Sequence, residues 1–473
     1  MEPKAGRGAI TVRFVEGSLG RFDGKVLSVA YGEKKPLNRR KFVLLMRKVV
    51  AQAKQNRIKS LVIDYKDIKG FAPKDMGDYE AGRVAGTAFV MADYEHVSYK
   101  TKPKDGWNFV EVVAILSVPG DGQRCLPAGR QGFADGLIIA GEVNATRELS
   151  NTPGGDMTPQ KLAAAAKAAA KASGAGAKLT VKVLGVKEMQ KLGMGAVLGV
   201  GKGAKDEPQF IIMEYRGGEG SPTSLKNPVV LVGKGVTFDT GGIQVKPGDH
   251  MYEMHMDMSG GAAVIHALVL AAKLKIKTNV IGLIPAVENA VGAGALRPGD
   301  ILKSLSGKSI EILHTDAEGR VILADAITYA KRYRPAIVAD AATLTGAALT
   351  ALGLHASALM TNREDMMEDI RALGEESGDY VWPFPLWEEY DDMVKGHFGD
   401  VPNISTSGNS RNGGVIAGGK FLEVFAKELD CPWLHLDIAP RMTGAQGEHL
   451  AKGAAGAPVR LFLSLIEKYA DQR

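Results

Sequence analysis

The sequence contains few cysteines and no long apolar run. Its two cysteines, Cys125 and Cys431, are far apart in a chain of 473 residues, and neither has a second cysteine nearby. A disulfide framework and a cysteine-based metal site are therefore excluded. The N-terminal stretch MEPKAGRGAITVRF lacks the apolar core of a signal peptide, and no stretch of charge-free apolar sequence is long enough to span a bilayer. We therefore expect a soluble, cytoplasmic protein without a membrane segment.

Neither the histidines nor the charge balance points to a function. The nine histidines form no pair at the spacing of metal ligands, although histidine is the commonest metal-binding side chain. Lysine and arginine together number 59 against 53 aspartates and glutamates, which gives a net charge of +6, and the two signs are interspersed. This balance makes DNA binding possible but does not support it.

The length and the alternation of patterns indicate two α/β domains. A chain of 473 residues is too long for one ordinary core. Residues 1–140 alternate strand-like runs such as SLVIDY with the helical pattern RKFVLLMRKVVAQAKQ, and they predict a smaller N-terminal α/β domain. Residues 141–473 predict a larger C-terminal α/β domain with a central mixed sheet flanked by helices. The segment 119–136, rich in glycine and arginine, is predicted to be an exposed loop or insertion.

A helix is predicted near the start of the larger domain. Thr158 is a suitable N-cap, Pro159 fits the first helical position, and the alanine-rich stretch LAAAAKAAAKA follows. Strand-like runs such as VVLVGKG and NVIGLIPA then alternate with apolar helices. In such a domain, ligands are expected where the strands end.

Two motifs of the larger domain place charged residues beside glycines. In VGKGVTFDTGG, Lys234 and Asp239 follow an apolar run, and the glycines allow a ligand to approach the backbone closely. Lys246 comes shortly afterwards. In MHMDMSGG, Asp257 stands at the expected start of a helix, where the helix dipole alone would favour an acid.

A third motif, HTDAEGR, places charges at alternate positions. Asp316, Glu318 and Arg320 would all face the same side if this segment were extended. Among the nearby histidines, His250 and His255 are interpreted as uninvolved. His314, two positions before Asp316, is equally consistent with an uninvolved residue and with one that supports a metal ligand.

Four carboxylates gathered in one domain would need positive charge beside them. Without cations they would repel one another and take up protons, at a cost of several kcal/mol. Two divalent ions would neutralise Asp239, Asp257, Asp316 and Glu318. A thiol-free, oxygen-rich ligand set suits Mg, Mn or Zn, so the identity of the metal stays open. A second interpretation also stays open, in which these acids are scattered over the surface.

The same motifs resemble those of the leucyl aminopeptidase family, the cytosolic dimetal M17 peptidases. VGKGVTFDTGG, the lysine of IQVKPG, MDMSGGAAV and TDAEGR carry the resemblance. It continues through RELSNTPGGDMTP, GMGAVLGVGKG, RPGDIL, DAATLTGA, PLWEEY and GAPVRLF, over nearly all of residues 145–465. The first domain resembles the family only in its α/β character and position. The resemblance implies that two metal ions are bound by five side chains, those of Lys234, Asp239, Asp257, Asp316 and Glu318.

The resemblance also implies roles for charged residues at the metals. Asp239 and Glu318 would be shared between the two ions, and Lys234 would bind as a neutral amine whose pKa the dications depress. Lys246 would be the charged electrophile that donates a hydrogen bond to the scissile carbonyl oxygen as it becomes an oxyanion. Arg320 would hold a bicarbonate ion that acts as the general base.

The implied activity is the release of the N-terminal residue of a peptide. The free α-amine of the substrate would bind one metal and its carbonyl oxygen the other, while a metal-bridging water attacks the carbonyl carbon. A bulky apolar, leucine-like first residue would lie against Met254, and Thr343 and Gly346 would help to hold the substrate backbone. The resemblance also implies a homohexamer.

Three residues depart from the usual pattern of the family. His314 stands where the family has asparagine, Val321 where it has leucine, and Thr240 where it has serine. The imidazole of His314 could alter hydrogen bonding around the metals or the metal preference.

Two other functions compete with the peptidase. A two-metal phosphoesterase is an alternative because Lys246 and Arg320 could clamp a phosphate. However, VGKG lacks the spacing of the phosphate-binding loop GxxxxGK[ST]. DNA binding would be an addition to catalysis.

Overall fold

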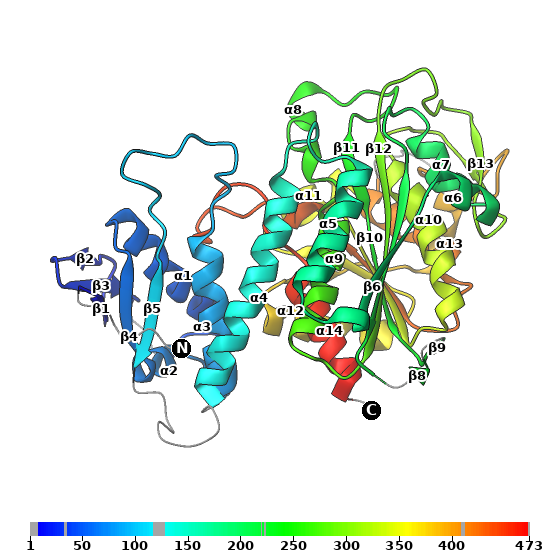
Figure 1. The fold of residues 1–473 in the computed structure, drawn as a ribbon. Helices are drawn as coiled ribbons and strands as arrows, with labels where there is room; N and C mark the ends of the chain where they lie inside the picture. Colours follow the sequence, from blue (N-terminus) through cyan, green and yellow to red (C-terminus); the bar gives the residue numbers. More distant parts are fainter. Residues whose placement is uncertain are drawn as a thin grey trace. The chain divides into compact units, whose positions relative to one another are not determined.

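The computed structural model describes residues 8–32, 36–116, 128–218, 220–221, 224–407 and 412–471. The chain divides into two compact units, Met1–Asn144 with Gly444–Lys452, and Ala145–Thr443 with Gly453–Arg473. The division falls within one long helix, α4 (Ala128–Asn151), as does the boundary predicted after residue 140. Both units combine helices with a sheet (Figure 1), so the predicted α/β class is confirmed.

The first unit contains a five-stranded, mostly parallel sheet in the order β2-β3-β1-β4-β5, in which β2 is antiparallel to β3. Its strands are β1 (Ile10–Val15), β2 (Arg21–Phe22), β3 (Val26–Ala30), β4 (Ser60–Asp64) and β5 (Val112–Leu116). Its helices, besides α4, are α1 (Arg39–Gln55), α2 (Tyr65–Phe71) and α3 (Asp78–Asp93). On α1, Phe42, Met46 and Val49 recur at helical spacing and are completely buried, so the helix packs through one apolar face.

The loop predicted at 119–136 is partly described. Residues 117–127 lie outside the described residues, whereas 128–136 form the first turns of α4, so the prediction of a loop was wrong for them. The glycines there permit close packing against α3. A Cβ on Gly132 would lie 1.8 Å from the carbonyl oxygen of Tyr79, and one on Gly136 would lie 2.3 Å from that of Arg83. Glycine thus serves helix contact in this segment.

The second unit contains a nine-stranded mixed sheet among its described residues. Eight strands follow the order β17-β16-β19-β15-β10-β12-β7-β6, and β11 pairs with β12. The pairs around β10 are parallel, whereas β6, β7 and β16 introduce antiparallel pairs. The strands are β6 (Leu179–Leu184), β7 (Gln209–Arg216), β10 (Val229–Gly233), β11 (Gly235–Asp239), β12 (Asn279–Asn289), β15 (Ile337–Ala342), β16 (Ser357–Thr361), β17 (Val381–Pro383) and β19 (Trp433–Asp437).

Helices cover both faces of this sheet. Figure 1 shows α5, α9 and α14 on one face and α7, α10 and α13 on the other. The helices are α5 (Pro159–Ala172), α6 (Val186–Leu192), α7 (Gly195–Gly201), α8 (Gly248–Met251), α9 (Ser259–Lys273), α10 (Glu318–Ala330), α11 (Gly346–Leu352), α12 (Met367–Ser377), α13 (Gly414–Ala426) and α14 (Val459–Asp471). Short strands lie outside the main sheet: β8 (Gly220–Ser221), β9 (Ser224–Leu225), β13 (Ile301–Lys303), β14 (Ser309–Glu311) and β18 (Val401–Pro402).

The predicted start of α5 is confirmed. The Thr158 hydroxyl accepts a hydrogen bond from the Lys161 backbone N–H at 3.3 Å, and Pro159 occupies the first helical position. The serine, threonine or asparagine side chain preferred at this position satisfies a backbone donor that the helix cannot. This helix anchors the N-terminal part of the second unit.

Among the described residues, one stretch, Gly248–Lys273, is long and apolar enough to cross a membrane by length and composition. Its most apolar window is 89% buried inside the structure. A buried core helix passes the same test, so this stretch is weak evidence for a membrane span.

Candidate metal centre and active site

The carboxyl ends of adjacent parallel strands supply the first group of site residues. Lys234 follows β10 directly, Asp239 ends β11, and Asn289 ends β12. β10 and β11 are consecutive segments that both pair in parallel with β12, so Lys234, between them, lies beside the middle of β12, whereas Asp239 and Asn289 are paired at its carboxyl end. Lys234 is 3% exposed and Asp239 is 2% exposed, so both charges are buried.

The HTDAEGR motif is a turn followed by a helix. Asp316 lies in the turn, whereas Glu318 begins α10 and Arg320 belongs to its first turn, so the predicted extended segment was wrong. The chain turns because the Ala317 N–H donates to the carbonyl oxygen of His314. An acid at the helix N-terminus is favoured by the helix dipole. Asp316 and Glu318 still meet, because one carboxylate oxygen from each, together with one from Asp239, lies within 4.8 Å of the other two.

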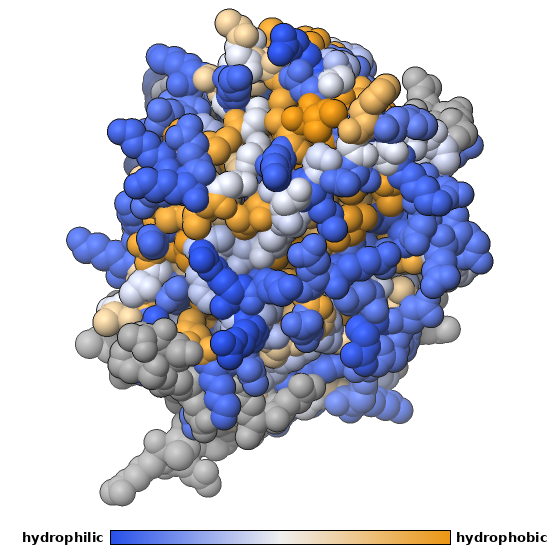
Figure 2. Space-filling view, turned by 90° about the vertical axis from the view of Figure 1, so that its right-hand side faces the viewer, coloured by the Kyte–Doolittle hydropathy of each residue, from blue (hydrophilic) through white to orange (hydrophobic). Residues whose placement is uncertain are grey.

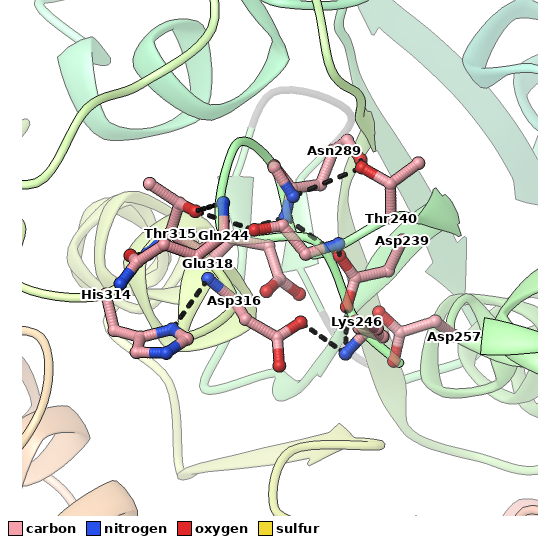
Figure 3. A network of polar contacts seen from close by, with 12 residues as sticks. Asp239, Thr240, Gln244, Lys246, Asp257, Asn289, His314, Thr315, Asp316 and Glu318 are labelled. Carbon is pink, nitrogen blue, oxygen red and sulfur yellow. Dashed lines mark hydrogen bonds and ion pairs between the residues drawn. The ribbon is translucent and has the colours of Figure 1, made fainter. Parts of the chain in front are cut away.

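Each of two lysines joins two carboxylates. The Lys234 ammonium lies 2.6 Å from Asp257 Oδ2 and 2.9 Å from Glu318 Oε1. The Lys246 ammonium lies 2.7 Å from Asp239 Oδ2 and also pairs with Asp316. Figure 3 shows Lys246 between these two acids, with Asp257 close by. The five predicted ligands and Lys246 therefore converge, and the interpretation of scattered surface acids is wrong.

The electrostatics of this cluster indicate a shortage of positive charge. Burial, followed by neighbouring carboxylates, raises the pKa of Asp257 to about 8, of Glu318 to about 7 and of Asp316 to about 6. Burial opposes the charge of Lys234, but Asp257, Glu318 and Asp239 together raise its pKa. Four carboxylates thus face two ammonium groups, and this donor set fits divalent ions. Lys234 can bind a metal only as a neutral amine. The dications must therefore lower its pKa by more than the neighbouring carboxylates raise it.

Two further residues hold the cluster in place. Asn289 Nδ2 donates to Asp239 Oδ1 at 2.8 Å and to the carbonyl oxygen of Thr315 at 3.1 Å. The Thr343 hydroxyl donates to Asp257 Oδ1 at 2.6 Å, and its carbonyl oxygen accepts from Lys234 at 2.9 Å. Thr343, predicted to hold substrate, therefore fixes two predicted metal ligands. Asn289 was missed, and its only sequence signal is an asparagine that closes an apolar strand.

The other predicted substrate residues lie on short elements beside the centre. Met254 begins the 3-10 turn Met254–Met256 and is partly buried, and its carbonyl oxygen accepts from the Asp257 N–H. Gly346 is exposed and is the first residue of α11, three positions after Thr343. Their contacts with substrate stay predictions.

Arg320 is buried without an acceptor. It is 7% exposed, and among the described residues no hydrogen bond or ion pair holds its guanidinium, whose Nε is fully buried. Burial lowers its pKa to about 10, while Asp437 and Glu318 oppose that shift. The oxygens of Asp437 are taken by the backbone N–H groups of Leu344 and Ala439 and by the Thr345 hydroxyl. A buried cationic donor without an acceptor fits a small anion such as bicarbonate.

Two of the departures from the family pattern touch the centre. His314 Nδ1 accepts a hydrogen bond from the Asp316 N–H at 3.2 Å, which places the proton of the neutral ring on Nε2. This contact favours the interpretation of His314 as a support for Asp316 (Figure 3). The Thr240 hydroxyl donates to the carbonyl oxygen of Asn289 at 2.8 Å, a bond that a serine hydroxyl could also make.

Comparison with known proteins connects this geometry to a family. A family model described as "Cytosol aminopeptidase family, catalytic domain" matches residues 144–463. The chain belongs to the cytosol aminopeptidase family. It is 42% identical over 379 residues to a "Probable cytosol aminopeptidase" of Nitrosococcus oceani, a match that covers 80% of this chain and 72% of the relative. A relative of the same description from Methylobacillus flagellatus is 41% identical over 394 residues, covering 83% of this chain and 75% of its own length.

A solved structure extends the comparison to the whole chain. "Bottromycin maturation enzyme BotP in complex with Mn" superposes with a TM-score of 0.83 at 28% identity, covering 98% of this chain and 100% of that one. Membership of the cytosol aminopeptidase family makes this protein a metal-dependent aminopeptidase, a hydrolase of peptides. The acidic group of Asp239, Asp316 and Glu318 is a suitable place for the metal.

Proposed function

We propose that this protein is a dimetal aminopeptidase that releases bulky apolar, leucine-like residues from peptides with a free N-terminus. The observation that carries the proposal is the pairing of each buried ammonium with two carboxylates, Lys234 with Asp257 and Glu318, and Lys246 with Asp239 and Asp316. Each of these two pairs of carboxylates attracts positive charge, and this supports the binding of two divalent ions. Mn or Zn suits the set, and Mg is a third candidate. The Mn bound in the solved relative supports Mn.

Two ions bound there would acidify a bridging water and polarise the scissile carbonyl. Lys246 stays protonated because Asp239, Glu318 and Asp316 raise its pKa against the effect of burial. Its flexible side chain can turn from these acids to the substrate carbonyl oxygen and donate a hydrogen bond as negative charge develops there. Lys246 is therefore assigned as the electrophile, and the five other residues as metal ligands, with Asp239 and Glu318 shared.

Arg320 is assigned to hold the general base. It lies two residues after Glu318 on α10, and its guanidinium lacks a hydrogen-bond acceptor among the described residues. Arg320 would hold bicarbonate there, and the bound anion would supply the general base for the attacking water. The arginine itself stays charged and keeps the anion in place.

The requirement for a free N-terminus follows from the arrangement of the ligands. A free α-amine can coordinate a metal, whereas the nitrogen of an internal or acetylated peptide cannot. We assign Met254 to contact the first side chain, and Thr343 and Gly346 to orient the substrate backbone. We assign catalysis to residues 141–473 and place the protein in the cytoplasm, which agrees with the names of its relatives.

We also propose a homohexamer. Large hydrophobic side chains are exposed in the second unit, among them Trp382 (56%), Trp387 (54%) and Phe398 (86%). Figure 2 shows hydrophobic patches interrupting a largely hydrophilic face of the molecule. Apolar surface of this kind supports contact between copies. Light scattering after size-exclusion chromatography tests the proposal, and a monomeric mass would contradict it.

The activity is tested with metal-stripped enzyme. Leucine p-nitroanilide is supplied with added Mn, Zn or Mg, and N-acetyl-leucine p-nitroanilide is the matched control. We expect metal-dependent release from the first substrate and none from the second. Equal turnover of both would contradict the role of the free amine, and absence of turnover with any unblocked substrate would overturn the aminopeptidase proposal.

A further inference from the structure

Two adjacent strands of the second unit bring a buried acid and a buried imidazole together. Asp340 on β15 lies opposite His435 on the parallel strand β19. His435 Nδ1 lies 2.5 Å from Asp340 Oδ1, and the other oxygen of Asp340 accepts from Trp433 Nε1 at 2.8 Å. Asp340 and His435 are both 0% exposed. The proposed peptidase chemistry does not yet use this pair.

His435 of this pair lies on β19, which also carries Asp437, an acid whose charge acts on Arg320. Asp437 follows His435 by two positions, so both side chains lie on the same face of β19. Asp437 Oδ1 accepts from the Leu344 N–H at 3.1 Å. A Cβ added to Gly418 would lie 3.2 Å from Leu344 Cδ2 and 3.6 Å from Arg320 Nη2, which places the guanidinium close to Leu344. Arg320, Asp437, His435 and Asp340 therefore form one buried layer.

The charges of this layer alternate when His435 is protonated. Burial opposes the imidazolium, but Asp340 and then Asp437 raise the pKa of His435, whereas Arg320 opposes the rise. The charges are then negative on Asp340, positive on His435, negative on Asp437 and positive on Arg320. Interactions between such groups are strong in a buried, low-dielectric layer.

Two nitrogen atoms of this layer have no hydrogen-bond acceptor among the described residues. They are His435 Nε2 and Arg320 Nε, and both are buried. Asp437 is the acid whose charge acts most strongly on Arg320. Its carboxylate oxygens nevertheless accept their hydrogen bonds from Leu344, Ala439 and Thr345. A positive charge on His435 weakens the pull of Asp437 on Arg320, and the guanidinium is left free for an external anion.

We propose that Asp340 and His435 are positioning residues that keep Arg320 available for its anion. The imidazolium of His435 offsets the negative charge of Asp437, and Asp340 fixes the orientation of the His435 ring. This inference rests on the proposed function, because it presupposes that Arg320 holds bicarbonate. Neither residue touches the substrate or the metals. Without the charge of His435, the negative charge of Asp437 acts on Arg320 undiminished and opposes the binding of bicarbonate.

The test compares bicarbonate binding in four proteins, the wild type, His435→Gln, Arg320→Ala and the matched control His355→Gln, whose histidine is exposed in the same unit. Two quantities are measured against bicarbonate concentration, the rise in melting temperature and the rate of leucine p-nitroanilide cleavage by Mn-loaded enzyme. We expect the half-saturating bicarbonate concentration to rise about tenfold in His435→Gln, as for residues that orient binding groups. The KM for the substrate should stay unchanged, and His355→Gln should match the wild type.

The outcomes separate this inference from the proposed function. If the wild type responds to bicarbonate, Arg320→Ala does not, and His435→Gln keeps the wild-type half-saturating concentration, the positioning role is overturned and the role of Arg320 stands. If the wild type does not respond in either measurement, the bicarbonate assignment is overturned, and the positioning role with it. Should His435→Gln fail to fold, Asp340→Asn decides in its place, because an asparagine oxygen can still accept from Trp433. The same tenfold rise is expected there.

Discussion

The two units of the chain bury different kinds of side chain. In the described part of the first unit, the buried charged residues are Arg47 and Glu142, and the core consists of side chains such as Phe42, Met46 and Leu61. The second unit buries Lys234, Asp239, Asp257 and Glu318 in one cluster, and Asp340 with His435 in another. The family match begins at residue 144, where the division between the units lies.

The difference shows what the active site costs the fold. Apolar packing stabilises the first unit, which buries few charged side chains. In the second unit, each buried carboxylate must be matched by an ammonium, a backbone N–H or a metal, because an unpaired buried charge is strongly unfavourable. Changes in the second unit should therefore alter metal content and chemistry, while changes in the first should alter stability alone.

The largest effect is expected for Asp257→Ala. The substitution removes a proposed metal ligand and leaves Lys234 with Glu318 as its remaining ion-pair partner. Loss of a metal should remove several kcal/mol of transition-state stabilisation, so we expect activity to fall by about four orders of magnitude. Metal analysis by mass spectrometry should show reduced occupancy. The control Asp369→Ala removes an exposed acid of the same unit. If Asp257→Ala kept two ions, the assignment of Asp257 as a metal ligand would be contradicted.

Lys246→Ala should lose most of the activity and keep both metals. The ammonium is assigned to the oxyanion, and removal of one such donor costs about a thousandfold in kcat. The measurements are kcat and metal content, with the exposed Lys427→Ala as control. A loss of metal equal to that of Asp257→Ala would make Lys246 a ligand and would remove the distinction between the two roles.

Phe42→Ala should destabilise the first unit and leave the metal centre of the second unit unchanged. Phe42 is completely buried on α1, and truncation of a buried phenylalanine costs about 3 kcal/mol or more. Denaturant unfolding measures the loss, and metal analysis should show full occupancy. Leu19→Ala, at a residue that is 87% exposed, should have little effect. Metal loss in Phe42→Ala would show that the two kinds of stabilisation are not separate.

The sequence predicted the parts of the fold and site that depend on local chemistry. Thr158 and Pro159 mark the start of α5 because an N-cap and a first-turn proline act within a few residues. The five predicted ligands and Lys246 were found because charged residues among glycines and apolar runs are conspicuous, and because the motifs resemble a family. Their convergence depends on strand order, which local patterns do not contain.

The errors and omissions have the same origin. Glu318 begins a helix because the chain turns at Asp316, and alternate charges in sequence do not reveal that turn. The glycines of residues 128–136 suggested a loop, yet they allow α4 to approach α3. Asp340 and His435 were missed because Asp340 is the single charged residue of β15 and His435 stands between two leucines of β19, so neither pattern is conspicuous. Only the pairing of β15 with β19 brings them together.

The smallest effect is expected for Asn289→Ala, which tests whether support of a ligand can be separated from ligation. Asn289 Nδ2 donates to Asp239 Oδ1 at 2.8 Å, so its loss frees the carboxylate to rotate without removing it. Metal affinity should fall about tenfold, a change of about 1.4 kcal/mol, measured by competition with a fluorescent chelator. The neighbouring residue provides the control, because Glu288 points to the opposite side of β12 and Glu288→Gln should leave affinity unchanged. If both variants bound metal as the wild type does, the Gly241 N–H, Lys246 and the ions would suffice to hold Asp239, and the buried asparagine would serve the turn at Thr315.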